Sequence, residues 1–329
     1  MGEARFAAID LGTVSSRLLC ATVRDGVVVN STKRTVITDL GEGVDASGVF
    51  APGAIERVAR ACGEFVNEAR AYGATCVSTT LTSAARDVSN GEKLLGRLRD
   101  LGLEPQVISG NVEARLTFYG VAHDFPGERI TVADSGGGST ELVVGAYAPG
   151  EGARAFALDC AQSLNIGCRR VTERFFTQEL PAQDEIEAAV AWMAPQFEAY
   201  WSELPARPDR LIAVGGTVTS LVAMVHELAV YDSHFVHLRD LTAEQVDDAI
   251  EMMRGLRVEQ VAALPGIQPK RAPVIFAGAV IVRELMRAGG YKRLTVSENS
   301  LLAGAAATIC ETMAGGEPVI GWAPTLSAL

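Results

Sequence analysis

The sequence predicts an α/β protein made of two similar domains. The chain has 329 residues, which is more than one hydrophobic core usually fills. Short apolar runs that suit strands alternate with segments of helical periodicity. The stretch that begins near residue 10 also recurs near residue 134, which lies 124 positions later. These three observations indicate a duplicated chain with strands and helices in both halves.

The first half begins with a β-meander, in which strands flank a tight turn at Gly12. Residues 52–72 carry apolar side chains at i, i+3, i+4 and i+7 and precede Gly73, so they predict an amphipathic helix with a glycine cap. The strands expected in this half lie at 6–10, 15–23, 26–37, 76–81 and 105–109. Further helices are expected at 92–101 and from about residue 111.

The duplication aligns Asp10 with Asp134, and it keeps a glycine, a serine and a leucine at matching positions. Each half therefore starts with a hairpin whose glycine-rich turn carries an aspartate. Two such halves are expected to face each other across a cleft, which is where small ligands usually bind. A third glycine turn follows the expected strand at 211–214 and precedes an expected helix. This turn is expected to approach the same cleft.

Composition excludes several classes of protein. A net charge of −11 disfavours a general nucleic-acid binder, so DNA is not an expected partner. No apolar run reaches the roughly 18 residues of a membrane span, and the first ten residues lack a signal-peptide pattern. We therefore expect a cytoplasmic protein without a membrane partner. Six cysteines occur without a C-x-x-C pair, which favours free thiols over zinc ligands or disulfides.

The stretch TVADSGGGSTELVVG, residues 131–145, predicts a phosphate site. Glycines allow backbone N–H groups to point at an anion, and Ser139 and Thr140 add hydroxyl donors. If the turn closes a hairpin, the carboxylates of Asp134 and Glu141 lie near the same phosphate. Because carboxylates repel phosphate oxygens, this arrangement implies a hard cation such as Mg²⁺ between them. A plain glycine-rich hairpin with two solvated acids is the alternative.

Several motifs in order resemble the exopolyphosphatase and guanosine pentaphosphate phosphohydrolase family, within the acetate and sugar kinase, Hsp70 and actin superfamily. They are IDLGTVSSRLL, TSAARDVSN, ISGNVEARLTFYGV, ADSGGGSTELVVG, SLNIGCRRVTERF, AVGGTVTSL and LPGIQPKRAPVIFAGAVIV. The resemblance covers nearly the whole chain. It implies two actin-like, or ribonuclease H-like, domains. It also implies release of a terminal phosphate from inorganic polyphosphate or pppGpp by an activated water and a divalent cation.

Carried over by position, the resemblance implies that Glu113 is the catalytic carboxylate and that Arg86 contacts phosphate. Phosphate oxygens near Glu113 would make it a stronger base, which suits activation of water. The planar guanidinium of Arg86 suits two phosphate oxygens. The alternatives are a surface glutamate in a first helical turn and an exposed arginine.

The predicted ligand sets follow from the duplication and from the resemblance. The metal-associated acids are Asp134, Glu141 and the duplicate Asp10. The phosphate-binding residues are Gly12, Thr13, Ser15, Gly136, Gly137, Gly138, Ser139, Thr140, Gly215, Gly216 and Thr217. Domain I is expected over 1–124, with a C-terminal helix at about 305–329 returning to it, and domain II over 125–304. Relatives imply a homodimer.

One departure from the family pattern concerns the first turn, which reads DLGTVSS where D-x-G-S-N-S is usual. Val14 replaces an amide that could donate a hydrogen bond to phosphate, which predicts weak hydrolysis that Val14→Asn would partly restore. Alternatively, Val14 packs under the turn and Ser15 or Ser16 supplies the donor. The helical HD-type domain of longer members is expected to be absent.

Three functions are compatible with these residues. The first is a Mg²⁺-dependent phosphoanhydride hydrolase that acts on polyphosphate or pppGpp. The second is a superfamily kinase or ATPase, which would need an adenosine pocket and a phosphate acceptor. The third is a non-catalytic binder of polyphosphate or an alarmone. The hydrolase is favoured, because Glu113 and Arg86 lie in hydrolase motifs.

Overall fold

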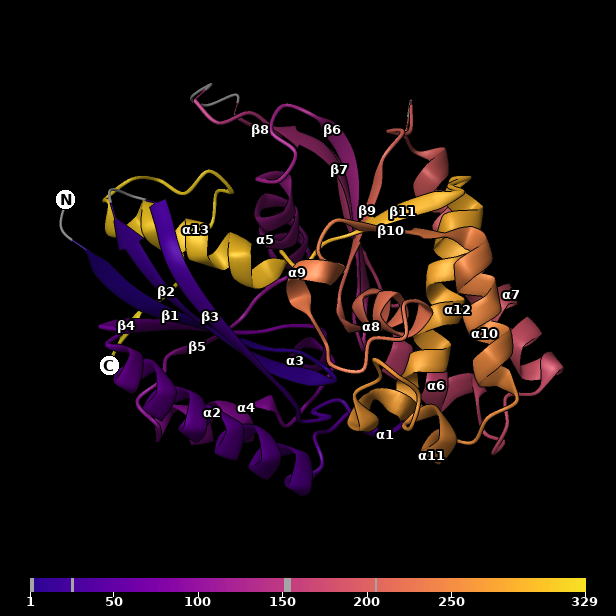
Figure 1. Ribbon diagram of the computed structural model, residues 1–329. Helices are drawn as coiled ribbons and strands as arrows, with labels where there is room; N and C mark the ends of the chain where they lie inside the picture. Colours follow the sequence, from indigo (N-terminus) through magenta and orange to yellow (C-terminus); the bar gives the residue numbers. More distant parts are fainter. Residues whose placement is uncertain (1–2, 25–26, 151–154, 205) are drawn as a thin grey trace. The chain divides into compact units, whose positions relative to one another are not determined.

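The computed structural model describes residues 3–24, 27–150, 155–204 and 206–329. The chain forms two compact units, each with its own β-sheet (Figure 1). Unit 1 comprises residues 1–123, 148–156 and 301–329, and unit 2 comprises residues 124–147 and 157–300. The predicted α/β fold class is confirmed by the two sheets and their covering helices.

The sheet of unit 1 starts with the expected meander. Strands β1, β2 and β3 pair antiparallel, whereas β4 and β5 continue the sheet in parallel with β1. Gly26, the first residue of the expected third strand, lies outside the described residues. A short strand at the end of the chain pairs with β4. In order across the sheet the strands are β12 (Ser327–Ala328), β4 (Cys76–Leu81), β1 (Ala4–Leu11), β2 (Ser15–Arg24) and β3 (Val27–Ile37), with β5 (Pro105–Val107) also beside β4.

Helices cover both faces of this sheet (Figure 1). Helix α2 buries the predicted apolar stripe, and Gly73 caps it in the left-handed conformation with φ of 86°. Helices α2 and α4 lie on one face, and α5 and α13 lie on the other. The bounds are α1 (Val44–Ser47), α2 (Pro52–Tyr72), α3 (Ser83–Arg86), α4 (Gly91–Arg99), α5 (Gly110–Ala122) and α13 (Leu301–Met313).

The C-terminal helix is shorter than the expected span of about 305–329. It ends at Met313, and Gly315 follows with φ of 76°. Glycine in this conformation and the nearby Pro318 both oppose continued helix, so the chain leaves the helix and reaches the sheet as β12.

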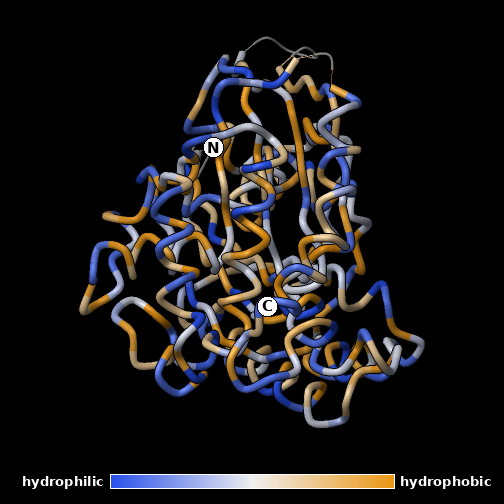
Figure 2. The backbone as a smooth tube through the Cα atoms, turned by 90° about the vertical axis from the view of Figure 1, so that its right-hand side faces the viewer, coloured by the Kyte–Doolittle hydropathy of each residue, from blue (hydrophilic) through white to orange (hydrophobic). Residues whose placement is uncertain are grey.

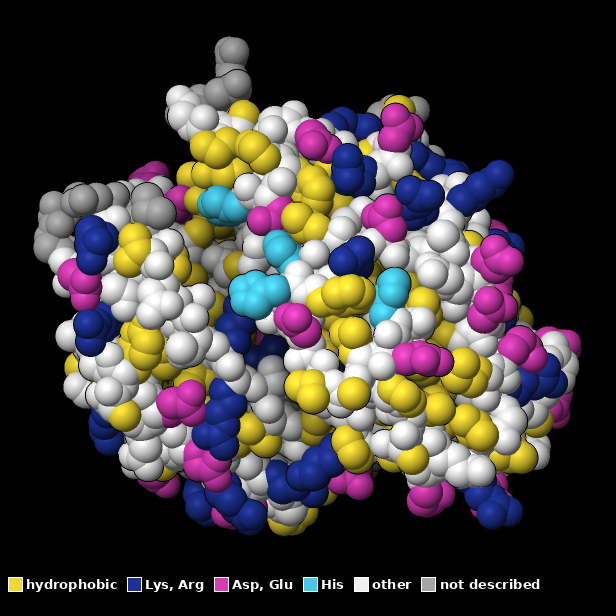
Figure 3. All heavy atoms as spheres, in the orientation of Figure 1, with side chains coloured by type: hydrophobic (Ala, Val, Ile, Leu, Met, Phe, Trp, Pro, Cys, Tyr) yellow, Lys and Arg dark blue, Asp and Glu magenta, His cyan; other side chains and the backbone are white. Residues whose placement is uncertain are grey.

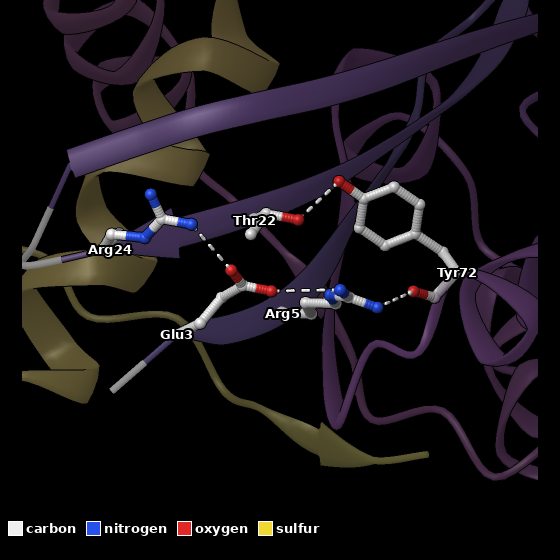
Figure 4. Close-up of polar contacts among 5 residues, drawn as sticks. All are labelled: Glu3, Arg5, Thr22, Arg24 and Tyr72. Atoms are coloured by element: carbon white, nitrogen blue, oxygen red, sulfur yellow. Dashed lines mark hydrogen bonds and ion pairs between the residues drawn. The ribbon is translucent and has the colours of Figure 1, made fainter. Parts of the chain in front are cut away.

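A polar network ties the end of α2 to the first strands (Figure 4). Glu3 accepts hydrogen bonds from Arg24 and Arg5, which lower the pKa of its carboxyl group below the usual value. Arg5 also donates to the carbonyl oxygen of Tyr72 at 3.2 Å, and the Tyr72 hydroxyl bonds Thr22 at 2.8 Å. These contacts fix the helix end to β1 and β2, although exposed ion pairs of this kind contribute little energy.

The sheet of unit 2 repeats the arrangement of unit 1. Strands β6 and β7 pair antiparallel, β8 flanks β7, and β9 runs parallel to β6. Strands β6, β7, β8 and β9 therefore correspond to β1, β2, β3 and β4, as the sequence duplication predicts. The order is β10 (Arg239–Thr242), β11 (Arg293–Val296), β9 (Leu211–Val214), β6 (Arg129–Ser135), β7 (Thr140–Tyr147) and β8 (Phe156–Leu164).

The helices of unit 2 pack around the long helix α12, which contacts α6, α7, α8 and α10 as well as β6. Its buried side chains are almost all apolar, and buried Glu284 is paired with Arg283 and Arg287. The bounds are α6 (Cys168–Phe175), α7 (Gln183–Ser202), α8 (Gly216–Val225), α9 (Ser233–Val236), α10 (Ala243–Arg254), α11 (Val258–Val261), η2 (Pro269–Arg271) and α12 (Ala272–Gly289).

Hydrophobic residues follow the extended segments of the chain, as the orange stretches at the centre of Figure 2 show. On the face drawn in Figure 3, acidic and basic side chains are interspersed rather than separated by sign. Among the residues that the structure describes, every helix is too short or too polar to cross a lipid bilayer. The six cysteines are free thiols, as expected, and burial raises the pKa of the Cys62 thiol to about 12.

Helix α5 depends on a close crossing with α13. A Cβ atom on Gly304 would lie 1.9 Å from the carbonyl oxygen of Leu116 and 3.1 Å from the backbone nitrogen of Gly120. The two backbones therefore approach more closely than any side chain at position 304 allows. This contact positions α5, which carries Glu113 in its first turn.

We expect Gly304→Ala to lower the thermal unfolding temperature, because its methyl group must push the α5 backbone away, at a cost of about 1–3 kcal/mol. The matched control is Gly96→Ala in α4, where a Cβ atom has nothing within 4 Å. That variant should be neutral or slightly stabilising, because alanine favours helix more than glycine does. Equal unfolding temperatures for the two variants would contradict the close crossing.

Candidate active site

The first hairpin closes with a turn held by its own backbone. The N–H of Gly12 donates to the carbonyl oxygen of Ser15 at 3.0 Å, and a Cβ atom on Gly12 would lie 3.2 Å from that oxygen. The carbonyl of Thr13 accepts from Gly41 at 2.8 Å. The predicted turn at Gly12 is therefore present, and a side chain at this position would crowd the carbonyl oxygen of Ser15.

Val14 packs under this turn. Its side chain is buried at 4% exposure, and its carbonyl accepts from the N–H groups of Thr38 and Asp39. Ser16 is also buried and hydrogen-bonds the hydroxyl of Thr38 at 2.9 Å, whereas Ser15 is partly exposed. Of the two readings of this departure, the geometry favours the one in which Val14 packs and Ser15 is the hydroxyl left to face a ligand.

Asp10 lies directly opposite Arg17 in the antiparallel pair of β1 and β2. The guanidinium of Arg17 contacts one carboxylate oxygen of Asp10 twice, through Nε at 2.8 Å and Nη2 at 2.6 Å. Asp10 is 1% exposed. The acid predicted as a metal ligand therefore carries a neutralising arginine in this structure.

The two predicted catalytic residues lie together in unit 1. Glu113 lies in the first turn of α5, whose N-cap Ser109 accepts from the N–H of Val112, and Arg86 ends α3. The Nη1 atom of Arg86 donates to Glu113 Oε2 at 2.8 Å and to the carbonyl oxygen of Ile108 at 3.0 Å. Glu113 is only 7% exposed, so the surface alternative does not fit it.

The second hairpin has the same turn with a different pair of charges. The N–H of Gly136 donates to the carbonyl oxygen of Ser139 at 2.9 Å, which matches the turn at Gly12. Asp134 lies directly opposite Glu141 in the pair of β6 and β7. Both are buried, at 7% and 2% exposure, so the alternative of two solvated acids does not fit. As predicted, the hairpin brings the two carboxylates to one face.

The carbonyl groups of the glycine-rich turn point at helix α6. The carbonyl oxygens of Gly136 and Gly137 accept from the N–H groups of Cys168 and Arg169 at 3.0 and 2.9 Å. The carbonyl of Gly138 accepts from Arg170 Nε at 3.0 Å. Because the N–H of a trans peptide points away from its C=O, the N–H groups of residues 137–139 point away from α6. Such a row of N–H groups suits an anion.

Thr140 uses its hydroxyl differently from the prediction. Its Oγ1 donates to the carbonyl oxygen of Ile166 at 2.6 Å, and the residue is completely buried. Its single hydroxyl hydrogen is therefore committed to the segment before α6 rather than to a phosphate. Ser139 is also buried, at 2% exposure.

The third glycine turn reaches the same place within unit 2. Gly215 has φ of 101°, and a Cβ atom there would lie 3.2 Å from Oδ1 of Asp134. A Cβ atom on Gly216 would lie 2.1 Å from Cζ of Arg271, and one on Gly278 would lie 2.3 Å from Thr217 Oγ1. Asp134 of the hairpin, the third glycine turn and Arg271 therefore lie close together. The sequence predicted this only for the hairpin and the third turn.

The acid pair of unit 2 fits a hard cation. Two carboxylates side by side repel each other when buried, and a divalent cation relieves that repulsion. Glu141 Oε1 accepts from Ser163 Oγ at 2.6 Å, which orients the carboxylate. Within the described residues, no group of three or more His, Cys, Asp or Glu could hold a metal ion. Mg²⁺ commonly takes only one or two carboxylates from a protein and completes its shell with water and phosphate oxygens.

Sequence reasoning missed four contributors to these sites, namely Arg17, Ser163, Arg170 and Arg271. Arg170 and Arg271 lie in the motifs SLNIGCRRVTERF and PKRAP, which carried the resemblance without a role for either arginine. Arg17 lies at one of the positions at which the two copies of the duplication differ. Ser163 has no local signal, because only strand pairing brings it to Glu141.

Two units of the same topology, each starting with an acid-bearing hairpin, define a duplicated α/β protein. The sequence profile of the Ppx/GppA phosphatase family matches residues 20–309. The chain therefore belongs to the Ppx/GppA phosphatase family, whose members are phosphoanhydride hydrolases.

Individual relatives agree with this assignment. Exopolyphosphatase 2 of Mycobacterium tuberculosis is 34% identical over 94% of this chain and 99% of its own length. The crystal structure of the Ppx/GppA family member of Aquifex aeolicus aligns with a TM-score of 0.76 at 28% identity, over 95% of this chain and 99% of that one. An exopolyphosphatase from Cytophaga hutchinsonii shares the fold, with a TM-score of 0.81 at 22% identity, over 94% of this chain and 98% of that one.

Gly167 provides a test of how α6 supports the glycine-rich turn. A Cβ atom at this position would lie 2.4 Å from the backbone of Gly137 and Gly138. We expect Gly167→Ala to displace the turn and to weaken binding of inorganic phosphate about tenfold or more, since each charge-assisted hydrogen bond is worth about 1.5–3 kcal/mol. Calorimetric titration with phosphate measures the effect.

The control for this variant is Gly255→Ala in the same unit, where a Cβ atom meets nothing within 4 Å. Its phosphate affinity should equal that of the unchanged protein. If Gly167→Ala also bound phosphate normally, the turn would not depend on its contact with α6.

Proposed function

We propose that this protein is an exopolyphosphatase that removes the terminal phosphate of inorganic polyphosphate, with pppGpp as a second substrate. The observation that carries the proposal is the glycine-rich turn of unit 2, whose N–H groups at 137–139 point away from α6 and beside which lies the pair of Asp134 and Glu141. The exopolyphosphatase names of its relatives support the choice of substrate. Val14 departs from the family pattern in the first hairpin, and this departure does not alter the second hairpin.

In this proposal the glycine-rich turn and Ser139 bind the oxygens of the terminal phosphate. The third turn, Gly215 to Thr217, contributes further backbone donors at the start of α8, where the helix dipole favours an anion. In unit 1, Gly12, Thr13 and Ser15 form the matching turn. Thr140 supports the turn through its hydrogen bond to the carbonyl oxygen of Ile166, and it does not contact phosphate.

Asp134 and Glu141 would hold the divalent cation, with Mg²⁺ as the expected ion. When bound, it would neutralise charge on the phosphate oxygens and favour departure of the remaining chain. Ser163 fixes the orientation of Glu141 through its hydroxyl. Both acids are buried, so their carboxylates have little contact with solvent.

Glu113 acts as the general base in the proposed reaction. One oxygen of its carboxylate accepts a proton from water, the water oxygen bonds to the terminal phosphorus, and the anhydride P–O bond breaks. The electron pair of that bond leaves with the shortened phosphate chain. Arg86 holds Glu113 through Nη1, so its remaining N–H groups are directed to other acceptors, and phosphate oxygens suit them.

The six free thiols suit a reducing compartment, which supports the expected cytoplasmic location. Self-association into a homodimer is the expectation carried from the resemblance, and light scattering on the purified chain measures it.

A phosphate-release assay on polyphosphate, pppGpp and ATP, with and without Mg²⁺, tests the proposed function. We expect Mg²⁺-dependent release from polyphosphate, slower release from pppGpp, and little from ATP. Production of ADP as the main reaction would favour the ATPase or kinase. Tight binding of polyphosphate without release would favour the non-catalytic binder.

Glu113→Gln should lower kcat by roughly 10² to 10⁴, because the amide keeps the size of the side chain but cannot accept a proton. Binding of inorganic phosphate should survive. The matched control is Glu56→Gln, which removes a carboxylate from an exposed pair with Arg97 at 2.8 Å. Glu113 would be excluded as the base if its variant kept the turnover of the Glu56 variant.

Asp134→Ala should raise the Mg²⁺ concentration for half-maximal activity by about tenfold or more, since one carboxylate ligand is lost and tenfold corresponds to about 1.4 kcal/mol. The rate at saturating Mg²⁺ should also fall. Asp159→Ala, which removes an exposed acid paired with Arg129 in the same unit, is the control. An unchanged Mg²⁺ requirement for the Asp134 variant would contradict its role as a ligand.

A further inference from the structure

The glycine-rich turn of unit 2 contacts the first turn of helix α6 through three successive carbonyl groups. The N–H of Cys168 donates to the carbonyl oxygen of Gly136 at 3.0 Å. The N–H groups of Arg169 and Arg170 donate to the carbonyl oxygen of Gly137 at 2.9 and 3.2 Å. The first N–H groups of a helix lack partners within the helix, and here the turn accepts them. The first two carbonyls are therefore held by backbone atoms, whatever side chains α6 carries.

The third carbonyl of the turn is held by a side chain. The next N–H of α6, that of Val171, donates within the helix to the carbonyl oxygen of Gly167 at 2.9 Å. The carbonyl oxygen of Gly138 accepts instead from Nε of Arg170 at 3.0 Å. Of the three contacts, this is the one that depends on the identity of a side chain in α6.

The carbonyl of Gly138 belongs to the same peptide as the N–H of Ser139. In a trans peptide these two groups point in opposite directions, so a donor that holds the carbonyl also sets the direction of the N–H. Glycine tolerates more backbone conformations than other residues do, so the backbone at Gly138 does little to fix this peptide. If the peptide rotated, a carbonyl oxygen would replace an N–H group at a place that suits an anion. The contact with Arg170 opposes that rotation.

We propose that Arg170 is a positioning residue, which acts through Gly138 to orient the N–H of Ser139 toward the terminal phosphate of the substrate. It does so by the hydrogen bond from Nε and not by its charge. The inference rests on the proposed function, which puts that phosphate at the glycine-rich turn. There the N–H of Ser139 would donate to a charged oxygen of the phosphate that water attacks, and such hydrogen bonds are stronger than those between neutral groups.

Three substitutions of similar length separate the hydrogen bond from the charge. Arg170→Gln has an amide nitrogen at the same number of bonds from Cα as Nε, so it keeps the donor and removes the charge. Arg170→Lys keeps the charge but has a methylene group at that place. Arg170→Met has a methyl group there, so it keeps neither the donor nor the charge.

Calorimetric titration with inorganic phosphate compares these variants. Arg170→Met and Arg170→Lys should bind phosphate about tenfold more weakly than the unchanged chain, because the N–H of Ser139 is no longer held toward it. Arg170→Gln should stay within about threefold. The reverse order, with normal binding by Arg170→Lys and weak binding by Arg170→Gln, would overturn the proposal, because Arg170 would then act through its charge. Thermal unfolding establishes that each variant is folded. If Arg170→Met does not fold, the comparison of Arg170→Gln with Arg170→Lys gives the answer.

The control is Arg174→Met, which removes a positive charge from the same helix one turn later. The guanidinium carbon of Arg174 lies 4.8 Å from the centre of the Trp192 ring. This variant should bind phosphate as the unchanged chain does. A loss of affinity equal to that of Arg170→Met would assign the effect to the overall charge of α6, and it would overturn the role of Arg170.

Hydrolysis gives a second measurement. Because Arg170 acts on the terminal phosphate alone, Arg170→Met should lower kcat/KM by the same factor for short and long polyphosphate chains. A larger loss for long chains would mean that Arg170 contacts the polymer directly, which would overturn the positioning role. If the unchanged chain neither binds inorganic phosphate nor releases it from polyphosphate, the proposed function is wrong, and the role of Arg170 fails with it.

Discussion

The antiparallel register of two hairpins is the constraint on which the sites depend. It sets residue 10 opposite residue 17 and residue 134 opposite residue 141, at the separation of about 5 Å that cross-strand neighbours share. Because side chains alternate along a strand, a shift of one residue would turn each of these acids to the other face. The turn that closes each hairpin, with glycine donating to the serine three residues later, holds that register.

Buried charge explains much of what surrounds these hairpins. An isolated carboxylate away from water is costly, and three of the carboxylates described above have a cationic or hydroxyl neighbour. Asp10 has Arg17, Glu113 has Arg86, and Glu141 has Ser163. A chain with a net charge of −11 must present a strong local attraction to bind a phosphate polymer. In the proposed function, backbone N–H groups and a few arginines would supply it.

Much of the fold follows from short-range signals in the sequence. The meander, helix α2 with Gly73 and the second hairpin were all predicted, because alternation, helical periodicity and glycine caps are local properties. The recurrence of Asp10 as Asp134 also predicted the duplication of topology. The C-terminal helix ends at Met313, short of the expected span of about 305–329, because Gly315 follows it in a left-handed conformation. In the candidate site, the sequence predicted that a hairpin brings Asp134 and Glu141 together, but it did not predict the pairing of Asp10 with Arg17. Arg17 was missed because the two copies were compared for likeness, and this is one of the positions at which they differ. The support of the glycine-rich turn by α6 depends on contacts between segments about 30 residues apart, which no local pattern reports.

The return of the chain to unit 1 affects the order in which the protein can fold. Residues 301–329 supply α13, which packs against α5, and β12, which pairs with β4. A ribosome delivers all of unit 2 before this segment emerges. Unit 2 can therefore form its core during synthesis, whereas α5 has its partner only after residue 304 is available. A nascent or truncated chain would carry the glycine-rich turn of unit 2 in place while Glu113 lay on an unsupported helix. Under the proposed function, the chain would then bind phosphate before it could hydrolyse polyphosphate.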